Sequence, residues 1–357
     1  MAKYDVTVLG AGYTGLSTAA ELAMNGQRVL VVAKDLGWRP PITIAGTQSR
    51  RWPGLAKSTQ AFDHKDLLHK ECKTLSRFLA LAANPDSGIH CIPALKLSKE
   101  EGVWWNKHTL NEADLAIATE VQANMKVACG RTVEASIIEK LRAVGYKSID
   151  ETQVMMVDSN KYFHFLIDIV KKNKGCISLG CSVTTADISK ICTKTVVNCL
   201  GVNSGEVGGA KGTFKTNQGQ CVLVRPSPGK CPYYIIDDDQ NAAIVQCPDG
   251  SLYLSSAAGP KDLNSGGFDA ECTEQTCSDC SLICKAVFGK EVTAEDVCES
   301  IFSDRPTRVE GFNVGTVTQM DDKTIIQNNG HAGAGVAASW ACAIDAARAA
   351  KKARIEK

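Results

Sequence analysis

The sequence predicts an α/β fold in which a discontinuous nucleotide-binding domain carries an inserted α+β domain. First, a buried strand at 4–10, a glycine turn, a helix that stops at Gly26 and a second strand at 28–35 form one β-α-β unit. Second, four later strand-like runs are separated by turns such as Pro248–Gly250, which indicates an antiparallel sheet. We expect residues 1–55, 150–210 and 305–357 to form the nucleotide-binding domain and residues 56–149 and 211–304 the inserted domain.

The remaining elements follow from the same patterns. Residues 64–83 and 160–175 read as helices, the second of which ends at a glycine. Short apolar runs at 176–187 and 194–201 return to the strand pattern of the opening, as expected for a parallel sheet that is completed late in the chain. The four strand-like runs of the inserted sheet are 219–226, 232–239, 242–248 and 250–259.

Composition excludes several classes of function. With 357 residues, 44% hydrophobic and 22% charged, the chain can form a large core and about two domains. A net charge of +1 gives no excess of cations to bind a nucleic acid. No apolar run approaches the roughly 20 residues that span a bilayer. We therefore expect small-molecule partners, with neither a nucleic acid nor a membrane.

The sixteen cysteines are scattered through apolar segments, so most are expected to be reduced and buried. The densest cluster contains a CxxC at Cys277 and Cys280, but no second ligand pair follows at the spacing of a zinc site. Because Cys277, Cys280 and Cys284 lie three and four residues apart, we expect them on one face of a helix in the core. No metal site is expected.

The first glycine turn, GAGYTG, carries the clearest chemical signal. Gly10, Gly12 and Gly15 have the GxGxxG spacing, follow a strand and open a helix. Gly10 permits a tight turn, Gly12 lets the backbone approach a pyrophosphate, and Gly15 allows the helix to pack closely on the strand. The unpaired N–H groups of the helix N-terminus favour an anion. We expect the intervening residues to contact the cofactor as well: Ala11, Tyr13 and Thr14.

The second strand departs from the usual dinucleotide pattern. Where an acidic residue normally binds a ribose, this chain has Ala33 and then Lys34, with Asp35 one residue late. We expect Lys34 and Asp35 near the adenosine part of the cofactor, although a solvated lysine at the strand end is the alternative. The glycine motif alone leaves NAD and FAD open.

The C-terminal part resembles the D-amino acid oxidase family, FAD-dependent enzymes that include D-aspartate oxidases and, more distantly, glycine oxidases. The resemblance rests on RPTR at 305–308 followed by NNGHAGAGVAASWACAIDAARAA at 328–350. The opening residues 6–36 are also similar to the family. Three further segments match its flavin loop, its VNxTG segment and its RGQ strand: 43–54, 196–206 and 219–224.

The resemblance implies an FAD cofactor and a Rossmann-like FAD-binding domain. In that family a hydride passes from the α-carbon of a D-amino acid to flavin N5, and the imino acid hydrolyses to a 2-oxo acid and ammonia. Dioxygen then reoxidises the flavin and gives hydrogen peroxide. Orientation and electrostatics carry the rate, so no catalytic acid or base is expected. A glycine or sarcosine-type amine oxidase and a flavin-binding protein without turnover are the alternatives.

The resemblance also implies site residues. Arg305 matches the arginine that binds the substrate carboxylate, since a guanidinium meets both oxygens at once. Gly333 matches the glycine whose carbonyl receives the substrate amino group. The segment after it matches the flavin-facing start of a helix: Ala334, Gly335 and Val336. The other cofactor contacts that the resemblance implies are Thr47, Gln48, Ser49, Val183 and Gly201.

Two positions depart from the family pattern. Ile244 falls where the family has a tyrosine that binds the carboxylate, so we expect Tyr234 or Tyr253, or else Tyr233, to replace it. Arg50 and Arg51 stand before Trp52 in the flavin loop. Arg50 or Arg51 in the pocket would favour D-aspartate or D-glutamate, whereas arginines that bind the pyrophosphate or face solvent would not. His331 is interpreted as a loop histidine that bonds to its surroundings, and not as a base.

The chain ends in ARIEK and carries no SKL-type signal, so a cytoplasmic location is expected and a peroxisomal one is left open. The sequence also leaves a homodimer open.

Overall fold

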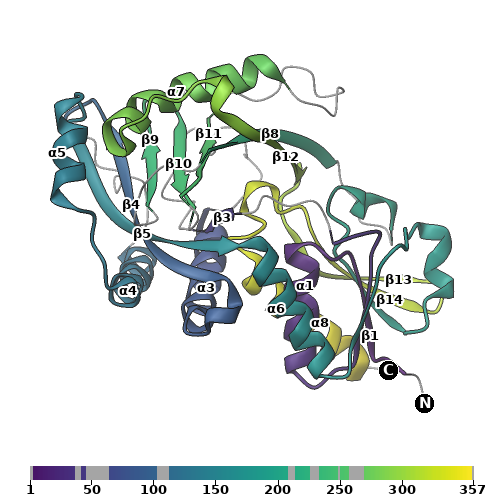
Figure 1. The fold of residues 1–357 in the computed structure, drawn as a ribbon. Helices are drawn as coiled ribbons and strands as arrows, with labels where there is room; N and C mark the ends of the chain where they lie inside the picture. The colour runs from purple at the N-terminus through teal and green to yellow at the C-terminus, as the bar shows by residue number, and fades with distance from the viewer. Residues whose placement is uncertain are drawn as a thin grey trace. The chain divides into compact units, whose positions relative to one another are not determined.

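The computed structural model describes residues 3–36, 42–45, 64–102, 112–207, 214–225, 233–247, 250–256 and 269–355 (Figure 1). The chain forms two compact units, each made from separate segments. The first unit comprises residues 1–89, 157–217 and 305–357, and the second comprises residues 90–156 and 218–304. The predicted α/β class, with one largely parallel and one largely antiparallel sheet, is confirmed.

The first unit is built on a six-stranded sheet with the order β13-β14-β7-β1-β2-β6. The strands β14, β7, β1, β2 and β6 are parallel, and β13 pairs antiparallel with β14. Every residue of β1 and β7 is buried, as their apolar sequences VTVL and TVVN require in a sheet covered on both faces. The bounds are β1 Val6–Leu9, β2 Val29–Val32, β6 Cys176–Ser178, β7 Thr195–Asn198, β13 Asn313–Met320 and β14 Lys323–Asn329.

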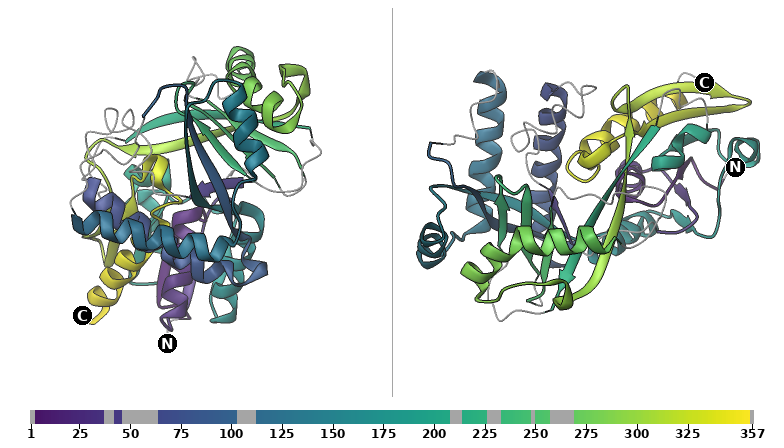
Figure 2. Two further views of the ribbon diagram at one scale, coloured as in Figure 1. Left: turned by 90° about the vertical axis from the view of Figure 1, so that its left-hand side faces the viewer. Right: turned by 90° about the horizontal axis from the view of Figure 1, so that it is seen from above.

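Helices α1 (Tyr13–Met24), α6 (Ser159–Lys172) and α8 (Ser339–Ile355) belong to this unit. Figures 1 and 2 show α1 and α8 side by side, although the chain reaches α8 last. Small side chains allow the two helices to approach closely: Ala19, Ala20 and Ala23 of α1 and Ala343, Ala346 and Ala350 of α8 are all buried. The alanine-rich sequence therefore serves helix packing.

Helix α3 (His64–Ala82) lies in the first unit, whereas we expected residues 56–149 in the inserted domain. Polar contacts with α8 explain the difference. Lys70 Nζ forms an ion pair with Asp345 Oδ2 at 2.9 Å, and the N–H of Ala341 donates to Thr74 Oγ1 at 3.2 Å. Periodicity predicted this helix correctly but could not show which unit it covers. Residues 150–156 and 211–217 also fall on the other side of the expected boundaries.

The larger sheet has eight strands in the order β12-β8-β11-β10-β9-β4-β5-β3. Its centre is antiparallel from β8 to β9, and β4 pairs parallel with β9. The four predicted strand runs of the inserted domain form β8, β11, β10 and β9. The bounds are β3 Ile42–Ala45, β4 Ile89–Ser98, β5 Ser148–Asp158, β8 Phe214–Val224, β9 Tyr234–Asp237, β10 Ala242–Gln246, β11 Leu252–Ser255 and β12 Val297–Arg308.

Helices α5 (Ala135–Ala143) and α7 (Ala270–Phe288) pack against one face of this sheet (Figure 1). The predicted helix with three cysteines on one face is confirmed, because Cys277, Cys280 and Cys284 of α7 are all buried in this core. Burial raises the pKa of Cys277 to about 11 and that of Cys284 to about 12. Among the residues that the structure describes, no group of three His, Cys, Asp or Glu side chains is arranged to hold a metal ion.

The other described helices are α4, the long helix that precedes α5, and five short 3₁₀ segments. None of the described helices is both long enough and apolar enough to cross a bilayer. Their bounds are α4 Glu112–Cys129, η2 Pro85–Ser87, η3 Thr185–Lys190, η4 Gly201–Glu206, η5 Ala294–Asp296 and η6 Ala332–Ala334.

Candidate functional site

The carboxyl ends of four parallel strands in the first unit lead into the predicted cofactor segments. Leu9 of β1 pairs with Val32 of β2 and with Asn198 of β7, and Asn198 pairs with Gln327 of β14. The chain builds β2 and β6 on one side of β1, then β7 and β14 on the other. Open α/β sheets bind their ligands beyond the carboxyl ends of the strands at such a reversal of order.

The three glycines of the first turn are needed for different structural reasons. Gly10 has φ +96°, and a Cβ there would lie 2.4 Å from the carbonyl oxygen of Cys199. A Cβ on Gly15 would lie 2.0 Å from the carbonyl oxygen of Gly10. At Gly12, by contrast, a Cβ would have no heavy atom within 4 Å. Packing of the chain therefore requires Gly10 and Gly15, whereas Gly12 leaves open space for a group that approaches the backbone.

The N-terminus of α1 is suited to an anion. Its N-cap residue is Gly12, with no side-chain cap, and the first turn carries no acidic residue. The N–H groups at a helix start have no partner within the helix and carry partial positive charge. The Tyr13 side chain is committed elsewhere, because its hydroxyl bonds to Ser159 Oγ and its ring lies edge-on to Phe163. Tyr13 therefore offers a ligand its backbone N–H but not its hydroxyl.

The second glycine segment follows β14 and approaches β12 closely. Gly330 has φ +82°, and a Cβ there would lie 2.7 Å from Cβ of Arg308. Ala332 has φ +48°, a left-handed conformation that is costly for a residue with a Cβ. Gly333 is exposed, and a Cβ on it would meet no heavy atom within 4 Å. This segment thus repeats the combination at the first turn, where one glycine is required by packing and another faces open space.

Helix α8 begins at Ser339, three residues later than the helix start expected at Gly335 and Val336. A 3₁₀ turn from Ala332 to Ala334 and further turns separate the glycines from the helix. Ala334 is buried, whereas Gly335 and Val336 are half-buried.

Polar side chains connect the two glycine segments. Thr18 of α1 donates to the carbonyl oxygen of Thr14 at 2.7 Å and accepts from Asn328 Nδ2 at 2.9 Å. Asn328 Oδ1 lies 3.1 Å from His331 Nε2, which must donate because an amide oxygen only accepts. His331 is therefore bonded to its surroundings and linked to the first turn of α1.

Burial, followed by the charge of Lys70, lowers the pKa of His331 to about 4. The folded protein therefore holds a neutral His331, while the unfolded chain takes up a proton below about pH 6.5. The contribution of His331 to the free energy of unfolding is therefore fully present above about pH 6.5 and is lost as the pH falls toward 4. We expect this residue to remove about 2 kcal/mol of unfolding free energy between pH 7.5 and 5.

Urea unfolding of the wild type and of His331→Gln at pH 7.5, 6 and 5 measures this contribution. The variant should lose the corresponding part of the pH dependence while other groups keep theirs. Identical pH slopes in the two proteins would contradict a buried neutral His331.

Arg305 lies on β12 with an exposed side chain. In the part of the chain that the structure describes, its guanidinium forms neither a hydrogen bond nor an ion pair. Arg308 differs, because its guanidinium contacts Glu310 and the carbonyl oxygen of Gly311. Thr307 forms an antiparallel bridge with His331, and Arg305 and Gly333 lie two residues from it along their own segments. The bridge therefore joins the segments that carry the two residues predicted to hold the substrate.

Tyr234 and Tyr253 share a face of the antiparallel sheet. Both pair directly with Val245, so the three side chains lie next to one another. Ile244 pairs with Ile235 and Leu254 on the opposite face, in the core under α5 and α7. Tyr233 also packs in that core. Of the three tyrosines considered, Tyr233 is thus on a different face from Tyr234 and Tyr253.

The other predicted cofactor residues lie beyond neighbouring strands. Lys34 and Asp35 are exposed after β2, and the carbonyl oxygen of Lys34 accepts from the N–H of Gly180. Val183 packs at the edge of the cluster that contains Leu9. Gly201, with φ +60°, opens η4 after β7. The flavin-loop residues fall outside the described part of the chain: Thr47, Gln48, Ser49, Arg50 and Arg51.

Asn198 was not among the predicted site residues, yet it holds the turn after β7. Its Nδ2 donates to the carbonyl oxygen of Ser204 at 3.0 Å and to Gln327 Oε1 at 2.9 Å, and its Oδ1 accepts from the N–H of Leu200. A polar residue that ends an otherwise apolar strand, as in TVVN, was the available signal.

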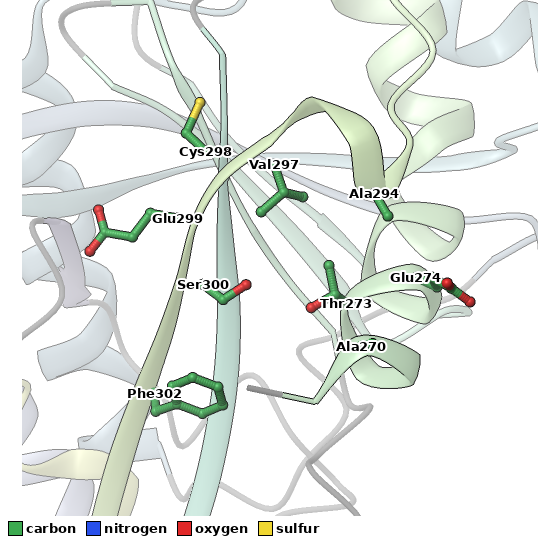
Figure 3. A pocket seen from close by; sticks show the side chains of 9 residues that line it. All are labelled: Ala270, Thr273, Glu274, Ala294, Val297, Cys298, Glu299, Ser300 and Phe302. Carbon is green, nitrogen blue, oxygen red and sulfur yellow. The ribbon is translucent and has the colours of Figure 1, made fainter. Parts of the chain in front are cut away.

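A cavity of about 400 Å³ lies in the second unit, between the first turns of α7 and strand β12 (Figure 3). Ser300 and Phe302 of β12 point toward α7, whereas Glu299 points away. All of its lining residues fall between Ala270 and Phe302, and none of the predicted cofactor or substrate residues is among them. The cavity is therefore separate from the glycine segments.

The described residues fit FAD. An uncapped helix N-terminus beside the open face of Gly12 suits a pyrophosphate. A second open backbone position at Gly333, linked to the first through Thr18 and Asn328, offers a site for another part of the same cofactor.

Comparison with known proteins agrees with this fit. The family described as FAD dependent oxidoreductase matches residues 5–349. A D-amino-acid oxidase of Streptomyces coelicolor is 23% identical over 348 residues, which are 97% of this chain and 96% of that protein.

Solved structures show the same fold. An iminodiacetate oxidase from Chelativorans sp. BNC1 has a TM-score of 0.68 at 13% identity and covers 97% of this chain and 95% of its own. A glycine oxidase from Bacillus cereus has a TM-score of 0.66 at 14% identity, with 98% and 97% covered. The match over nearly the whole chain, together with the two open glycines, shows that the protein belongs to the FAD-dependent oxidoreductases.

Proposed function

We propose that the protein is a D-amino-acid oxidase, which converts a D-amino acid, dioxygen and water to a 2-oxo acid, ammonia and hydrogen peroxide. The observation that supports this proposal is the exposed Arg305 guanidinium on β12, which makes no hydrogen bond or ion pair within the described residues, while the Thr307–His331 bridge joins the segments that carry Arg305 and Gly333. The similarity to D-amino-acid oxidases along the chain supports the same activity.

Bound FAD would supply the hydride acceptor. The chain's own residues bind and orient the substrate. Arg305 is suited to a carboxylate because its planar guanidinium donates two parallel hydrogen bonds. The carbonyl of Gly333 would receive the amino group, and the two contacts together fix the α-carbon. His331 is neutral and bonded to Asn328, so it is not proposed as a base.

A panel of D-amino acids scored by peroxide release tests the activity. At least one D-amino acid should release peroxide and bleach the flavin absorbance without oxygen, while its L-enantiomer should do neither, because a clamped carboxylate and amino group present only one hydrogen to the cofactor. The absence of bleaching with every D-amino acid, with glycine and with sarcosine would overturn the assignment to an amino acid oxidase.

Glycine and sarcosine belong in the panel because an amine oxidase of that type is the alternative within the family. Turnover of these two alone would favour it. Yellow protein that no substrate bleaches would instead indicate flavin binding without turnover. The preference for acidic D-amino acids that Arg50 would confer stays a prediction, which the ratio of D-aspartate to D-alanine turnover in the same panel measures.

A further inference from the structure

Two cysteines of the second unit lie close to the same turn, where α4 ends. Cys91 is on β4, and Cys129 is the last residue of α4. The Cys91 thiol donates to the carbonyl oxygen of Met125 at 3.3 Å. Met125 is one helical turn before Cys129, so Cys91 is seated on the same turn as the second cysteine. Both cysteines are only half-buried and open to small solutes.

The second thiol lies at the end of the same helical turn, where Cys129 Sγ is 3.6 Å from the carbonyl oxygen of Arg131. Burial, followed by the neighbouring Cys129, raises the pKa of Cys91 to about 12. Cys91 is therefore a thiol at neutral pH, and it is seated on the helical turn that carries the second cysteine.

We propose that Cys91 and Cys129 form a modification site that hydrogen peroxide converts to a reversible disulfide. The site goes beyond the oxidase activity. Peroxide is the product of the proposed reaction, but the sulfur chemistry requires only that peroxide be present. A disulfide here would tie the end of α4 to β4.

The chemistry is a two-electron oxidation in two steps. The Cys129 thiolate attacks one oxygen of hydrogen peroxide, which breaks the O–O bond, gives a sulfenic acid and releases hydroxide. The hydroxide takes the proton that Cys129 lost and becomes water. Cys91 then attacks the sulfenic sulfur, the S–S bond forms, the S–O bond breaks, and the thiol proton leaves with the hydroxyl as a second water. The two sulfurs are oxidised and the peroxide is reduced.

Other cysteines of the chain are placed differently. Cys277, Cys280 and Cys284 lie on one helix in the core, where oxidants do not reach them readily. Cys181 is exposed, and within the described residues its thiol contacts Ser178 Oγ and the carbonyl oxygen of Leu179 and not a turn that carries a second cysteine. We therefore expect hydrogen peroxide to oxidise the Cys91–Cys129 pair to a disulfide in preference to the buried cysteines of α7 and to Cys181.

The test adds hydrogen peroxide to the folded holoenzyme without substrate, so it does not depend on the proposed activity. Free thiols are then blocked and the protein is digested without reduction. Mass spectrometry should show one dominant cross-linked peptide pair that contains Cys91 and Cys129, and dithiothreitol should separate it. Free Cys91 and Cys129 after treatment, or the same mixture of pairs as in denatured protein, would overturn the proposal.

Single variants test the order of the two steps. Cys91→Ser should leave a Cys129 sulfenic acid that dimedone traps, whereas Cys129→Ser should leave Cys91 as an unreacted thiol. Cys181→Ser is the matched control, since it removes an exposed thiol and should leave the cross-link unchanged. Dimedone labelling of Cys91 in Cys129→Ser would contradict the assigned order, and loss of the cross-link in Cys181→Ser would contradict the pairing itself.

Discussion

Replacing Gly12 with valine is expected to weaken FAD binding by about 100-fold or more while the fold survives, which corresponds to about 3 kcal/mol of binding free energy. The new side chain enters space that no atom of the chain occupies. Gly12 has φ −80° and ψ −173°, an extended conformation that valine adopts readily. The measurement is the dissociation constant of FAD by flavin fluorescence, together with thermal unfolding of the apoprotein.

Gly15→Ala is the matched control at the same turn. A Cβ there lies 2.0 Å from the backbone oxygen of Gly10, so this smaller change should destabilise the apoprotein by about 2 kcal/mol or more. The Gly12→Val apoprotein should stay within about 1 kcal/mol of the wild type. Unchanged FAD affinity in Gly12→Val would refute the assignment of Gly12 to the pyrophosphate site.

Arg305→Met is expected to lower kcat/KM for the best D-amino acid by about 1,000-fold, or roughly 4 kcal/mol of transition-state stabilisation. Methionine keeps much of the side-chain length but removes both charge and hydrogen bonds. Because Arg305 is exposed and makes no side-chain bond within the described residues, the flavin spectrum and the unfolding temperature should not change. Steady-state kinetics and thermal unfolding measure the two parts of this prediction.

Arg308→Lys provides the comparison, because Arg308 already contacts Glu310 and Gly311 and is not available to a substrate. It should keep kcat/KM within a few-fold and lose some stability. Arg305→Lys should fall between the wild type and Arg305→Met, since it keeps the charge but not the paired hydrogen bonds. Wild-type kinetics in Arg305→Met would remove the main support for an amino acid substrate.

Sequence patterns correctly predicted the secondary-structure elements that are determined by residues close together in the chain. The strand before GAGYTG, the helix after it, and the cysteines three and four apart on α7 were read correctly because backbone conformation and side-chain period decide them. The sequence could not show that α3 packs on α8 through Lys70 and Asp345, because that contact joins residues far apart in the chain.

In the candidate site, too, local motifs could be read from the sequence, whereas contacts between distant segments could not. Arg305 and Gly333 could be named from their motifs, but only the bridge between Thr307 and His331 shows that the segments carrying them lie side by side. For the candidate tyrosines, a shift of one residue along the strand decides which face of the sheet a side chain occupies. Val245 pairs with Tyr234 and Tyr253, whereas Ile244 faces the core, and strand alternation cannot be assigned to a face before the layers are known.

The hydrogen bond between Thr18 and Asn328 joins residues 310 positions apart, and this has a consequence for biosynthesis. During translation β1 and its glycine turn emerge early, but the β14 strand and the Gly330–Gly335 segment that complete the sheet edge emerge late. A nascent chain therefore holds half of the cofactor site for most of its synthesis, with β7 lacking its outer neighbour. We therefore expect tight FAD binding only from chains that have been translated through β14.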